Sequence, residues 1–271
     1  MNWTVDNIPN LEGRVILVTG SNSGIGFETS KALLAKGAIV IMGYRSKGKV
    51  EIACQELLKH SNNGKIELLE INLGDLEAVN RAADQLIDKY GKLDLLINNA
   101  GIMAPPYTIS KQGFEIQFAV NHLAHMALTI KLLPLLTQSI GARIVTVSSG
   151  AQYMGRIDWD DLQKKNNYNR WSSYAQSKLA NVMFALELDI ILRNFKSNIG
   201  SYVAHPGLAR TNLQSASVSA NGSWLEALAY KIMGPMFQHA SMGALPQLFA
   251  ATETTAKSGY QYGPKYNFRG Y

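Results

Sequence analysis

The stretch RVILVTGSNSGIG, residues 14–26, decides the fold. Its first half is a short apolar run that ends at Gly20, and runs that are apolar on both faces are typical of strands buried between helix layers. Its second half, TGSNSGIG, carries three glycines at the point where a helix is expected to follow. The stretch therefore predicts a buried strand, a tight turn and a helix in direct succession.

The turn has the chemistry of a phosphate-binding loop, although its glycines do not follow the G-x-G-x-x-G spacing. Glycine allows a tight turn and lets a phosphate approach the backbone. The helix that follows offers free N–H groups and the positive end of its dipole. We therefore expect the loop to bind the pyrophosphate of a dinucleotide through five residues: Gly20, Ser23, Gly24, Ile25 and Gly26.

The strand and helix pattern repeats along the chain. Five further short apolar runs occupy residues 38–44, 65–72, 93–99, 142–149 and 199–205. Helical stretches lie between them, such as 26–37, which ends at Gly37, and 75–91, with Asp75 as N-cap and Gly91 at its end. This alternation predicts an α/β fold, a doubly wound parallel sheet of the Rossmann type with helices on both faces. No linker interrupts it, so we expect a single domain over residues 1–271.

The composition is that of an ordinary globular protein. The chain has 271 residues, of which 46% are hydrophobic and 17% charged, and its formal net charge is +6. The basic residues are scattered and form no block, which argues against nucleic acid and suits an anionic small ligand. No apolar run reaches the roughly 18 residues of a membrane span. With one cysteine and no signal-peptide pattern at the N-terminus, we expect a cytoplasmic protein.

The end of the second strand indicates which dinucleotide binds. In such folds an acidic residue there contacts the ribose 2′-OH of NAD, whereas an arginine accommodates the 2′-phosphate of NADP. The run 38–44 ends in Tyr44 and is followed by Arg45, with no carboxylate. Because a guanidinium matches a phosphate well, Arg45 favours NADP as the cofactor, with NAD as the alternative.

The stretch WSSYAQSKLAN, residues 171–181, places Tyr174 and Lys178 four positions apart. On a helix they would share one face. A lysine ammonium nearby favours the phenolate and lowers the pKa of a tyrosine toward a range useful for general acid–base catalysis. The spacing alone is common on exposed helices, so its interpretation depends on the rest of the chain.

The remaining motifs supply that context. They are TGSNSGIG (19–26), NNAG (98–101), VNHLAH (120–125), VTVSS (145–149), YAQSK (174–178) and HPGLART (205–211), in this order. Together they resemble the short-chain dehydrogenase/reductase family, and most closely its retinol-dehydrogenase-like branch. The resemblance runs from about residue 10 to the end of the chain.

The resemblance implies a catalytic tetrad. Tyr174 corresponds to the proton donor or acceptor, Lys178 to its partner, Ser149 to the catalytic serine and Asn121 to the asparagine that anchors a water for proton relay. It also implies the cofactor contacts, which would include Tyr174 and Lys178 as well as seven further residues: Asn72, Asn98, Ala100, Gly101, Pro206, Gly207 and Thr211. Asn72 stands where the family often has an aspartate, and the residues between Ser149 and Tyr174 form a longer insertion than many members have.

These observations predict an oxidoreductase that transfers hydride between NAD(P) and the carbonyl or alcohol group of an apolar small molecule. A nucleotide-binding sensor or scaffold that has lost turnover is the alternative from another class. A sugar-nucleotide epimerase or dehydratase is a third, but such enzymes usually carry a larger domain after the position of Thr211.

Other features are given structural interpretations. His122 and His125 lie on one helical stretch without a third ligand, so we expect packing and no metal site. The stretch 223–245 is rich in Met and aromatic residues, which are usually core, with a mobile cover over an apolar substrate as the alternative. Residues 212–240 are expected to be the substrate-covering region. The helix over 179–192 is apolar on more than one face, which suggests burial in the core or in a homo-oligomer.

Overall fold

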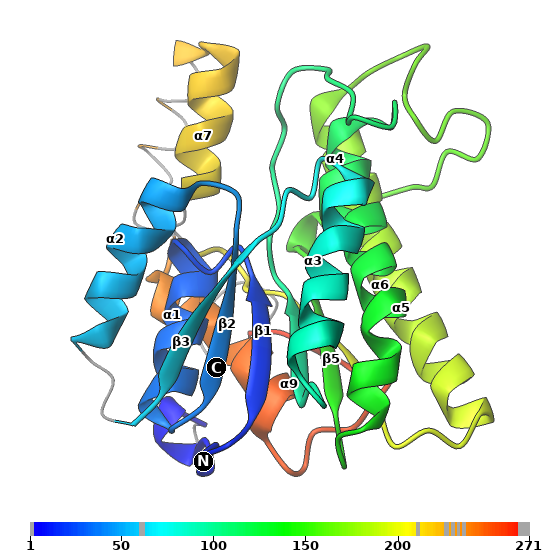
Figure 1. Ribbon diagram of the computed structural model, residues 1–271. Coiled ribbons are helices and arrows are strands. Elements are labelled where there is room, and N and C mark those ends of the chain that lie inside the picture. Colours follow the sequence, from blue (N-terminus) through cyan, green and yellow to red (C-terminus); the bar gives the residue numbers. More distant parts are fainter. Residues whose placement is uncertain are drawn as a thin grey trace.

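The computed structural model describes residues 3–59, 63–209, 212–224, 228, 231, 234 and 237–264. Its centre is a parallel sheet of seven strands in the order β3-β2-β1-β4-β5-β6-β7 (Figure 1). The strands are β1 (Val15–Thr19), β2 (Ile39–Tyr44), β3 (Lys65–Glu70), β4 (Leu95–Asn98), β5 (Arg143–Val147), β6 (Gly200–Ala204) and β7 (Gln261–Tyr262). All six predicted strands are confirmed, and the two-residue β7 is an addition that was too short to stand out in the sequence.

Eight α-helices are described together with three short 3-10 or π-helical segments. The α-helices are α1 (Gly24–Ala35), α2 (Lys47–Leu58), α3 (Leu76–Lys89), α4 (Ile116–Phe118), α5 (Ala124–Thr137), α6 (Arg170–Asn194), α7 (Asn212–Asn221) and α9 (Ala240–Thr252). The short segments are the 3-10 turns η1 (Val5–Asn7) and η3 (Gly150–Met154) and the π-helical turn η2 (Ala119–Leu123), which joins α4 to α5. The alternation of strands and helices on which the fold prediction rested is thus confirmed.

Two hydrophobic cores lie on opposite faces of the sheet. In β1, Val15 and Leu17 pack into the core under α3, α5 and α6, whereas Ile16 and Val18 pack into the core under α1, α2 and α9. This division follows from the pleat, because successive side chains of a strand point to opposite faces. The sheet is therefore covered by helices on both sides, as the doubly wound fold requires.

The helix ends follow the local sequence. Gly37, with φ of 89°, ends α1 in a Schellman arrangement, in which its N–H donates to Leu34 O and the N–H of Ala38 donates to Leu33 O. Asp75 is confirmed as the N-cap of α3. The same helix ends at Lys89, because Tyr90 turns to extended backbone, so the predicted end at Gly91 is wrong by two residues.

One helical segment among the described residues, Ile116–Thr137, is long and apolar enough to cross a membrane by those two criteria. Half of the apolar window is buried inside this fold, where α5 packs against the sheet and α3. A core helix passes the same test, so this segment is weak evidence for a membrane span.

Candidate active site

The carboxyl ends of the central strands bring together most of the predicted site residues. The glycine loop follows β1, Arg45 follows β2, residues 98–102 follow β4, Ser149 follows β5 and Pro206 follows β6. In open parallel α/β sheets, ligands bind beyond this edge. The helix α7 and the loop after η3 stand at the same end of the sheet (Figure 1).

The glycine loop is built so closely that side chains cannot enter it. Gly20 has φ of 66°, and a Cβ there would lie 2.9 Å from Cα and Cβ of Ala100. A Cβ on Gly26 would lie 2.3 Å from the carbonyl oxygen of Gly20 and 2.5 Å from Nδ2 of Asn99. Gly24, at the first position of α1, has φ of 56°. Each glycine is therefore required by its backbone conformation or by a close contact.

The N-terminus of α1 has polar groups that suit a pyrophosphate. Ser23 is the N-cap residue, but its side chain makes no capping hydrogen bond within the described structure. The hydroxyl of Ser21 is buried and has no partner among the described residues. Ile25 packs toward α9, since a Cβ on Gly243 would lie 3.4 Å from its side chain. The loop thus leaves donors for a phosphate at a positive helix end, and its residues fit that group.

Residues 98–101 approach the glycine loop mainly through Asn99 and the backbone. Asn98 is buried and donates from Nδ2 to Thr129 Oγ1 at 2.9 Å, on the side of the sheet covered by α5. Asn99 instead donates from Nδ2 to Thr19 O at 2.8 Å, and Ala100 N–H donates to Thr19 Oγ1 at 3.0 Å. Asn99, which the sequence interpretation passed over, is therefore the asparagine whose side chain contacts the loop.

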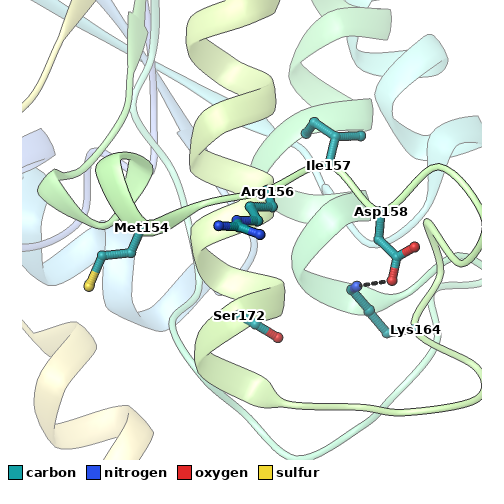
Figure 2. Close-up of a pocket in the computed structure, with 6 residues that line it drawn as sticks. All are labelled: Met154, Arg156, Ile157, Asp158, Lys164 and Ser172. Atoms are coloured by element: carbon teal, nitrogen blue, oxygen red, sulfur yellow. Dashed lines mark hydrogen bonds and ion pairs between the residues drawn. The ribbon is translucent and has the colours of Figure 1, made fainter.

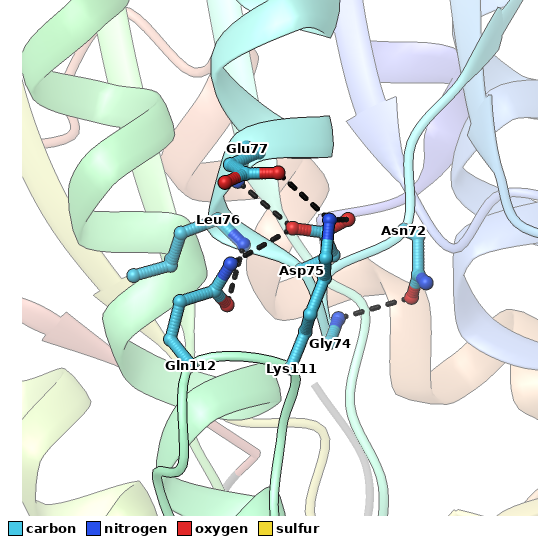
Figure 3. A network of polar contacts seen from close by, with 7 residues as sticks. All are labelled: Asn72, Gly74, Asp75, Leu76, Glu77, Lys111 and Gln112. Carbon is cyan, nitrogen blue, oxygen red and sulfur yellow. Dashed lines mark hydrogen bonds and ion pairs between the residues drawn. The ribbon is translucent and has the colours of Figure 1, made fainter.

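Arg45 and Asn72 lie at the ends of adjacent strands β2 and β3. Arg45 is exposed and follows the last residue of β2 directly. Asn72 is exposed, and its Oδ1 accepts a hydrogen bond from Gly74 N–H at 3.0 Å (Figure 3). The carbonyl of the Asn72 side chain thus serves its own turn, while its NH2 group and the second lone pair of Oδ1 remain for other partners.

Asp75, close to Asn72, serves the helix and the neighbouring loop. Its carboxylate accepts from Glu77 N–H at 3.0 Å, from Gln112 Nε2 at 2.9 Å and from Lys111 Nζ at 3.2 Å (Figure 3). These hydrogen bonds, led by that of Gln112, lower the pKa of Asp75 to about 2. The carboxylate is therefore engaged in joining α3 to the loop at 111–112.

Tyr174 and Lys178 lie on one buried face of α6. The Tyr174 side chain is 5% exposed and that of Lys178 is 4% exposed, and Nζ lies 5.9 Å from the centre of the tyrosine ring. Nζ donates to Val147 O, at the end of β5, at 3.2 Å. Burial lowers the pKa of Lys178 to about 8. The lysine is therefore a buried cation beside the tyrosine, held by the strand that leads to the serines.

The two serines after β5 have different surroundings. Ser148 is buried and donates from Oγ to Lys178 O at 2.8 Å. Ser149 is half-buried, and its Oγ accepts from Ala151 N–H at 3.3 Å as the N-cap of η3. The first serine thus fixes α6 against β5, and the second keeps its hydroxyl hydrogen for another acceptor.

Asn121 is fully buried in the π-helical turn η2, and its side chain is used by the protein itself. Its Oδ1 accepts from Ile102 N–H at 2.8 Å, and its Nδ2 donates to Ile102 O at 3.0 Å and to Ser177 Oγ at 2.9 Å. Both amide hydrogens are therefore occupied. A water bound at Asn121 would have to use the remaining lone pairs of its oxygens.

Gly101 shows how closely these groups approach one another. A Cβ on it would lie 3.1 Å from Asn121 Oδ1 and 3.4 Å from Lys178 Nζ. The NNAG segment thus passes beside the lysine and the asparagine, and its first residues contact the glycine loop. The structure brings the loop, the NNAG segment and the Tyr174–Lys178 face into one continuous site.

The last predicted contacts follow β6. Pro206 O accepts from Gln238 Nε2 at 2.9 Å, and Gly207 has φ of 65°. Thr211 lies outside the described residues, as does much of the segment after residue 224, so the predicted cover over 212–240 is described only in part.

A surface depression lies beside the start of α6 and shares no lining residue with the predicted site. It is lined by Met154, Arg156, Ile157, Asp158, Lys164 and Ser172, with an ion pair of 2.6 Å between Lys164 and Asp158 (Figure 2). The segment that forms it is fixed to α6 by Asp158 N–H, which donates to Gln176 Oε1 at 3.1 Å. Ser172 and Gln176 share a helix face that lies about 200° around α6 from Tyr174 and Lys178. The contact that fixes this segment to α6 therefore lies on the opposite side of the helix from Tyr174 and Lys178.

The two histidines of VNHLAH are packed inside the protein. His122 lies against the rings of Phe118 and Phe184, with Nδ1 3.3 Å from Asn181 Oδ1. His125 is buried between Thr19 and Asn121. No group of three or more metal-ligating side chains that could hold an ion occurs among the described residues.

A doubly wound sheet with a glycine loop and a buried Tyr–Lys pair at its carboxyl edge defines a dinucleotide-binding oxidoreductase. Comparison with known proteins agrees, since residues 14–222 match the family described as short chain dehydrogenase. The chain belongs to this family, and within it to the retinol-dehydrogenase-like branch. It is therefore an NAD(P)-dependent oxidoreductase.

Individual relatives support this assignment. The chain is 40% identical over 262 residues to a short-chain dehydrogenase/reductase of Armillaria gallica, covering 94% of this chain and 81% of that protein. It is 36% identical over 241 residues to human retinol dehydrogenase 12, covering 89% and 74%. Among solved structures, an uncharacterized protein from Mycobacterium paratuberculosis is 37% identical with a TM-score of 0.81, covering 100% of this chain and 87% of that one.

Proposed function

We propose that the protein reduces a carbonyl, or oxidises the corresponding alcohol, with Tyr174, Lys178, Ser149 and Asn121 as its catalytic residues. The observation that carries the proposal is the buried face of α6, where the Lys178 ammonium lies beside the Tyr174 ring and is bonded to the end of β5. A cation held there favours the phenolate of Tyr174. The hydroxyl can then give or take a proton near neutral pH.

The roles of the residues follow from their places. Tyr174 donates a proton to the carbonyl oxygen during reduction, and Ser149, with its hydroxyl hydrogen free of the η3 cap, donates a hydrogen bond to the same oxygen. Asn121 holds the NNAG segment against the site through Ile102, and the remaining lone pair of its Oδ1 would anchor the water that relays protons to Lys178. A nicotinamide dinucleotide, when bound, supplies the hydride chemistry, while the protein positions and polarises the substrate.

Tyr174→Phe tests this assignment. The variant keeps the ring and removes the proton, so we expect NADPH oxidation with a panel of aromatic aldehydes and ketones to fall at least about 10²-fold, with NADPH affinity nearly unchanged. Unchanged turnover would remove Tyr174 from the mechanism. Wild-type protein that binds NADPH but turns over no carbonyl or alcohol in a broad screen would favour the nucleotide sensor.

We further propose that NADP is preferred over NAD. Arg45 is exposed directly after β2, where the ribose 2′ position is expected, and no acidic side chain stands beside it in the sequence. A guanidinium–phosphate pair is a strong, charge-assisted contact. Arg45→Ala should therefore weaken NADPH binding by about tenfold or more and leave NADH binding unchanged. Fluorescence titration of both cofactors measures this, and tighter NADH binding by the wild type would contradict it.

The substrate class, the assembly and the location are also proposals. A relative named retinol dehydrogenase, together with the exposed Met154 and Trp171 near the start of α6, supports an apolar carbonyl or alcohol as substrate. We propose that residues 212–240 form its cover within a single domain. The exposed apolar stripe on α6 supports a homo-oligomer; it is formed by Met183, Leu186, Ile190 and Ile191. A cytoplasmic location is supported by the single cysteine of the chain, which suits a reducing compartment.

A further inference from the structure

His125 is a buried titratable side chain to which the proposed chemistry gives no role. It lies in the first turn of α5 and is 1% exposed. Its Nδ1 is 3.1 Å from the backbone oxygen of Asn121, and its Nε2 is 2.9 Å from Thr19 Oγ1. The ring therefore connects the π-helical turn that carries Asn121 with the last residue of β1.

The two contacts determine which ring nitrogen carries the proton. A backbone carbonyl can only accept, so Nδ1 must be the protonated nitrogen that donates to Asn121 O. Complete burial lowers the pKa of His125 to about 4, so the ring is neutral near pH 7. Nε2 is then a bare acceptor, and the Thr19 hydroxyl donates to it.

The hydroxyl of Thr19 has all of its hydrogen-bonding capacity in use. Its oxygen accepts from Asn99 N–H at 2.9 Å and from Ala100 N–H at 3.0 Å. Its single hydrogen has two acceptors in reach, His125 Nε2 at 2.9 Å and Ile97 O at 3.4 Å, and the shorter contact is the stronger. His125 thus orients the hydroxyl so that both of its lone pairs face the NNAG backbone.

The result is that residues 99–102 are fixed at two points. The Thr19 hydroxyl holds Asn99 and Ala100, and the Asn121 side chain holds both backbone groups of Ile102. Between these points lies Gly101, where a Cβ would come within 3.4 Å of Lys178 Nζ. Ala100 also lies against Gly20, so the same backbone supports the glycine loop.

We propose that His125 and Thr19 form a positioning pair, in which a neutral histidine holds the threonine hydroxyl so that it sets the NNAG backbone against both the cofactor loop and Lys178. The predicted effect of the pair on turnover rests on the proposed function. Its predicted effect on cofactor binding does not depend on the role of Tyr174. Neither residue touches the reacting atoms in this arrangement. Both act through the backbone of residues 99–102.

Four variants separate the two hydrogen bonds of the ring. Thr19→Val removes the hydroxyl with little change of shape, and Thr19→Ser keeps it. His125→Asn keeps a donor close to the position of Nδ1 but lacks an acceptor at Nε2. His125→Gln can place its Oε1 near the position of Nε2 and accept from Thr19. Thr129→Val is the matched control, because it breaks a buried 2.9 Å bond between α5 and Asn98 without touching residues 99–102.

The measurements are NADPH affinity by fluorescence titration, kcat and KM with an aromatic aldehyde per NADPH-binding site, and the melting temperature of each variant. We expect Thr19→Val and His125→Asn each to weaken NADPH binding and to lower kcat by about tenfold, with KM for the aldehyde changed less than threefold. Thr19→Ser and His125→Gln should restore most of both. The double variant Thr19→Val/His125→Asn should be no worse than the poorer single variant, because one bond is lost in both.

Thr129→Val should melt at a lower temperature but keep wild-type kcat and NADPH affinity per folded site. A purely structural pair would behave like this control, so folded Thr19→Val with wild-type kcat and affinity would overturn the proposal. If His125→Asn does not fold, the comparison of Thr19→Val with Thr19→Ser still tests the hydroxyl, and a folded His125→Gln with tenfold lower kcat and affinity would contradict the role of the ring as its acceptor. Full activity of Tyr174→Phe would instead contradict the proposed function, and the NADPH affinities would still report on the pair.

Discussion

At the scale of single residues, the direction of each side chain at the strand ends decides its role. In β4, Leu96 belongs to the core under α5, so Asn98, two residues on, points the same way and contacts Thr129. Ile97 belongs to the opposite core, and Asn99 follows it toward the glycine loop. The period of two in a strand could have predicted this from the sequence. The motif NNAG alone could not, because it contains both asparagines.

The contact between the Thr19 hydroxyl and the His125 ring could not be predicted from the sequence, for a different reason. His125 follows Thr19 by 106 positions, and their contact depends on how α5 lies across β1. The π-helical turn at Ala119–Leu123 also changes which residues face the site, since a five-residue hydrogen-bond spacing shifts the helix phase. By contrast, the choice of Ser149 over Ser148 came from the resemblance, and it agrees with the hydroxyl hydrogen that Ser149 keeps while its oxygen caps η3.

Gly26→Ala should damage the cofactor loop. Its Cβ would lie 2.3 Å from Gly20 O, so the loop or α1 must shift. We expect NADPH affinity to fall by more than about tenfold and the melting temperature to drop, because the clash is with backbone and a helix must move. The control is Gly91→Ala, with nothing within 4 Å of the new Cβ and a position at the amino edge of the sheet. Equal NADPH affinity in both variants would contradict a closely packed loop.

Lys178→Met should stabilise the protein near neutral pH while it abolishes turnover. The pKa of Lys178 is about 8 in the folded chain, against an ordinary value of 10.5, because burial disfavours the ammonium. Between about pH 8 and 10.5, Lys178 is therefore protonated in the unfolded chain and mostly neutral in the folded chain. As pH rises through that interval, the free energy of unfolding of the wild type increases. Below pH 8 the buried charge costs stability.

We expect the methionine variant to be more stable than the wild type by about 2 kcal/mol at pH 7, after allowance for the lost bond to Val147 O. The difference should shrink above pH 8, reach zero at about pH 9.5 and reverse by pH 10.5, where the neutral lysine of the wild type still has its bond to Val147 O. Urea unfolding of both proteins from pH 6.5 to 10 measures it. A variant that is less stable at every pH would show that packing and the hydrogen bond outweigh the buried charge.

At the scale of elements, helix boundaries were predictable where a side chain or glycine caps them. Asp75 and Gly37 were both identified from the sequence and are confirmed. The end of α3 was not, because Tyr90 leaves the helix through extended backbone, for which the local sequence carries no strong signal. The segment between η3 and α6 is irregular and fixed by side chains such as Gln176, so its path follows from tertiary contacts.

Asp75→Ala tests how strongly the start of α3 depends on its network. The carboxylate caps the helix and accepts from Gln112 and Lys111, and its pKa of about 2 lies below the ordinary 3.8. Its contribution to stability is present above pH 3.8 and is lost as pH falls toward 2. We expect the variant to melt several degrees below the wild type at pH 7, in line with the loss of a cap, and the gap to narrow between pH 4 and 2.

Asp84→Ala is the control in the same helix. Asp84 pairs with Lys131 at 2.8 Å, but its side chain is 53% exposed, and exposed pairs contribute little. Its melting temperature should stay close to the wild type across the same pH range. If both variants melt at the same lowered temperature at pH 7, the hydrogen bonds of Asp75 stabilise the protein no more than an exposed ion pair does.

At the scale of the whole molecule, the sequence predicted the doubly wound class because each buried strand is a short apolar run between amphipathic segments. The carboxyl ends of such parallel strands meet at one edge of the sheet. For this reason the glycine loop, Ser149 and Pro206 could be assigned to one site from the sequence. The cover over 212–240 could be proposed only from composition, and Thr211 lies outside the described residues. In the proposed arrangement, substrate identity depends on that part of the chain and on the loop before α6, where the fold does not fix the chemistry.

The assembly of whole molecules is the last property that α6 allows us to predict. Its outer face carries an exposed apolar stripe with helical spacing, formed by Met183 (44% exposed), Leu186 (37%), Ile190 (45%) and Ile191 (43%). The sequence interpretation expected this helix to be buried on several sides, and one chain leaves the stripe uncovered. Contiguous exposed apolar surface of this kind marks interaction sites. A second copy of the chain that presents the same helix would cover it through a two-fold contact.

We therefore expect the wild type to sediment at twice the chain mass of 29.7 kDa or more, and Leu186→Glu/Ile190→Glu to sediment as a single chain. Two carboxylates at the centre of an apolar contact would be buried without partners, which costs several kcal/mol and exceeds what a modest interface supplies. The control is Ile52→Glu on α2, 71% exposed and apart from the stripe, which should leave the mass unchanged. Analytical ultracentrifugation at tens of micromolar chain distinguishes these outcomes, and a wild-type mass of one chain would mean that the stripe faces something other than another copy.

Tyr174 and Lys178 lie on the inner face of the same helix, so a dimer would also hold that helix more rigidly. The monomeric variant Leu186→Glu/Ile190→Glu should therefore also have a lower turnover than the wild type.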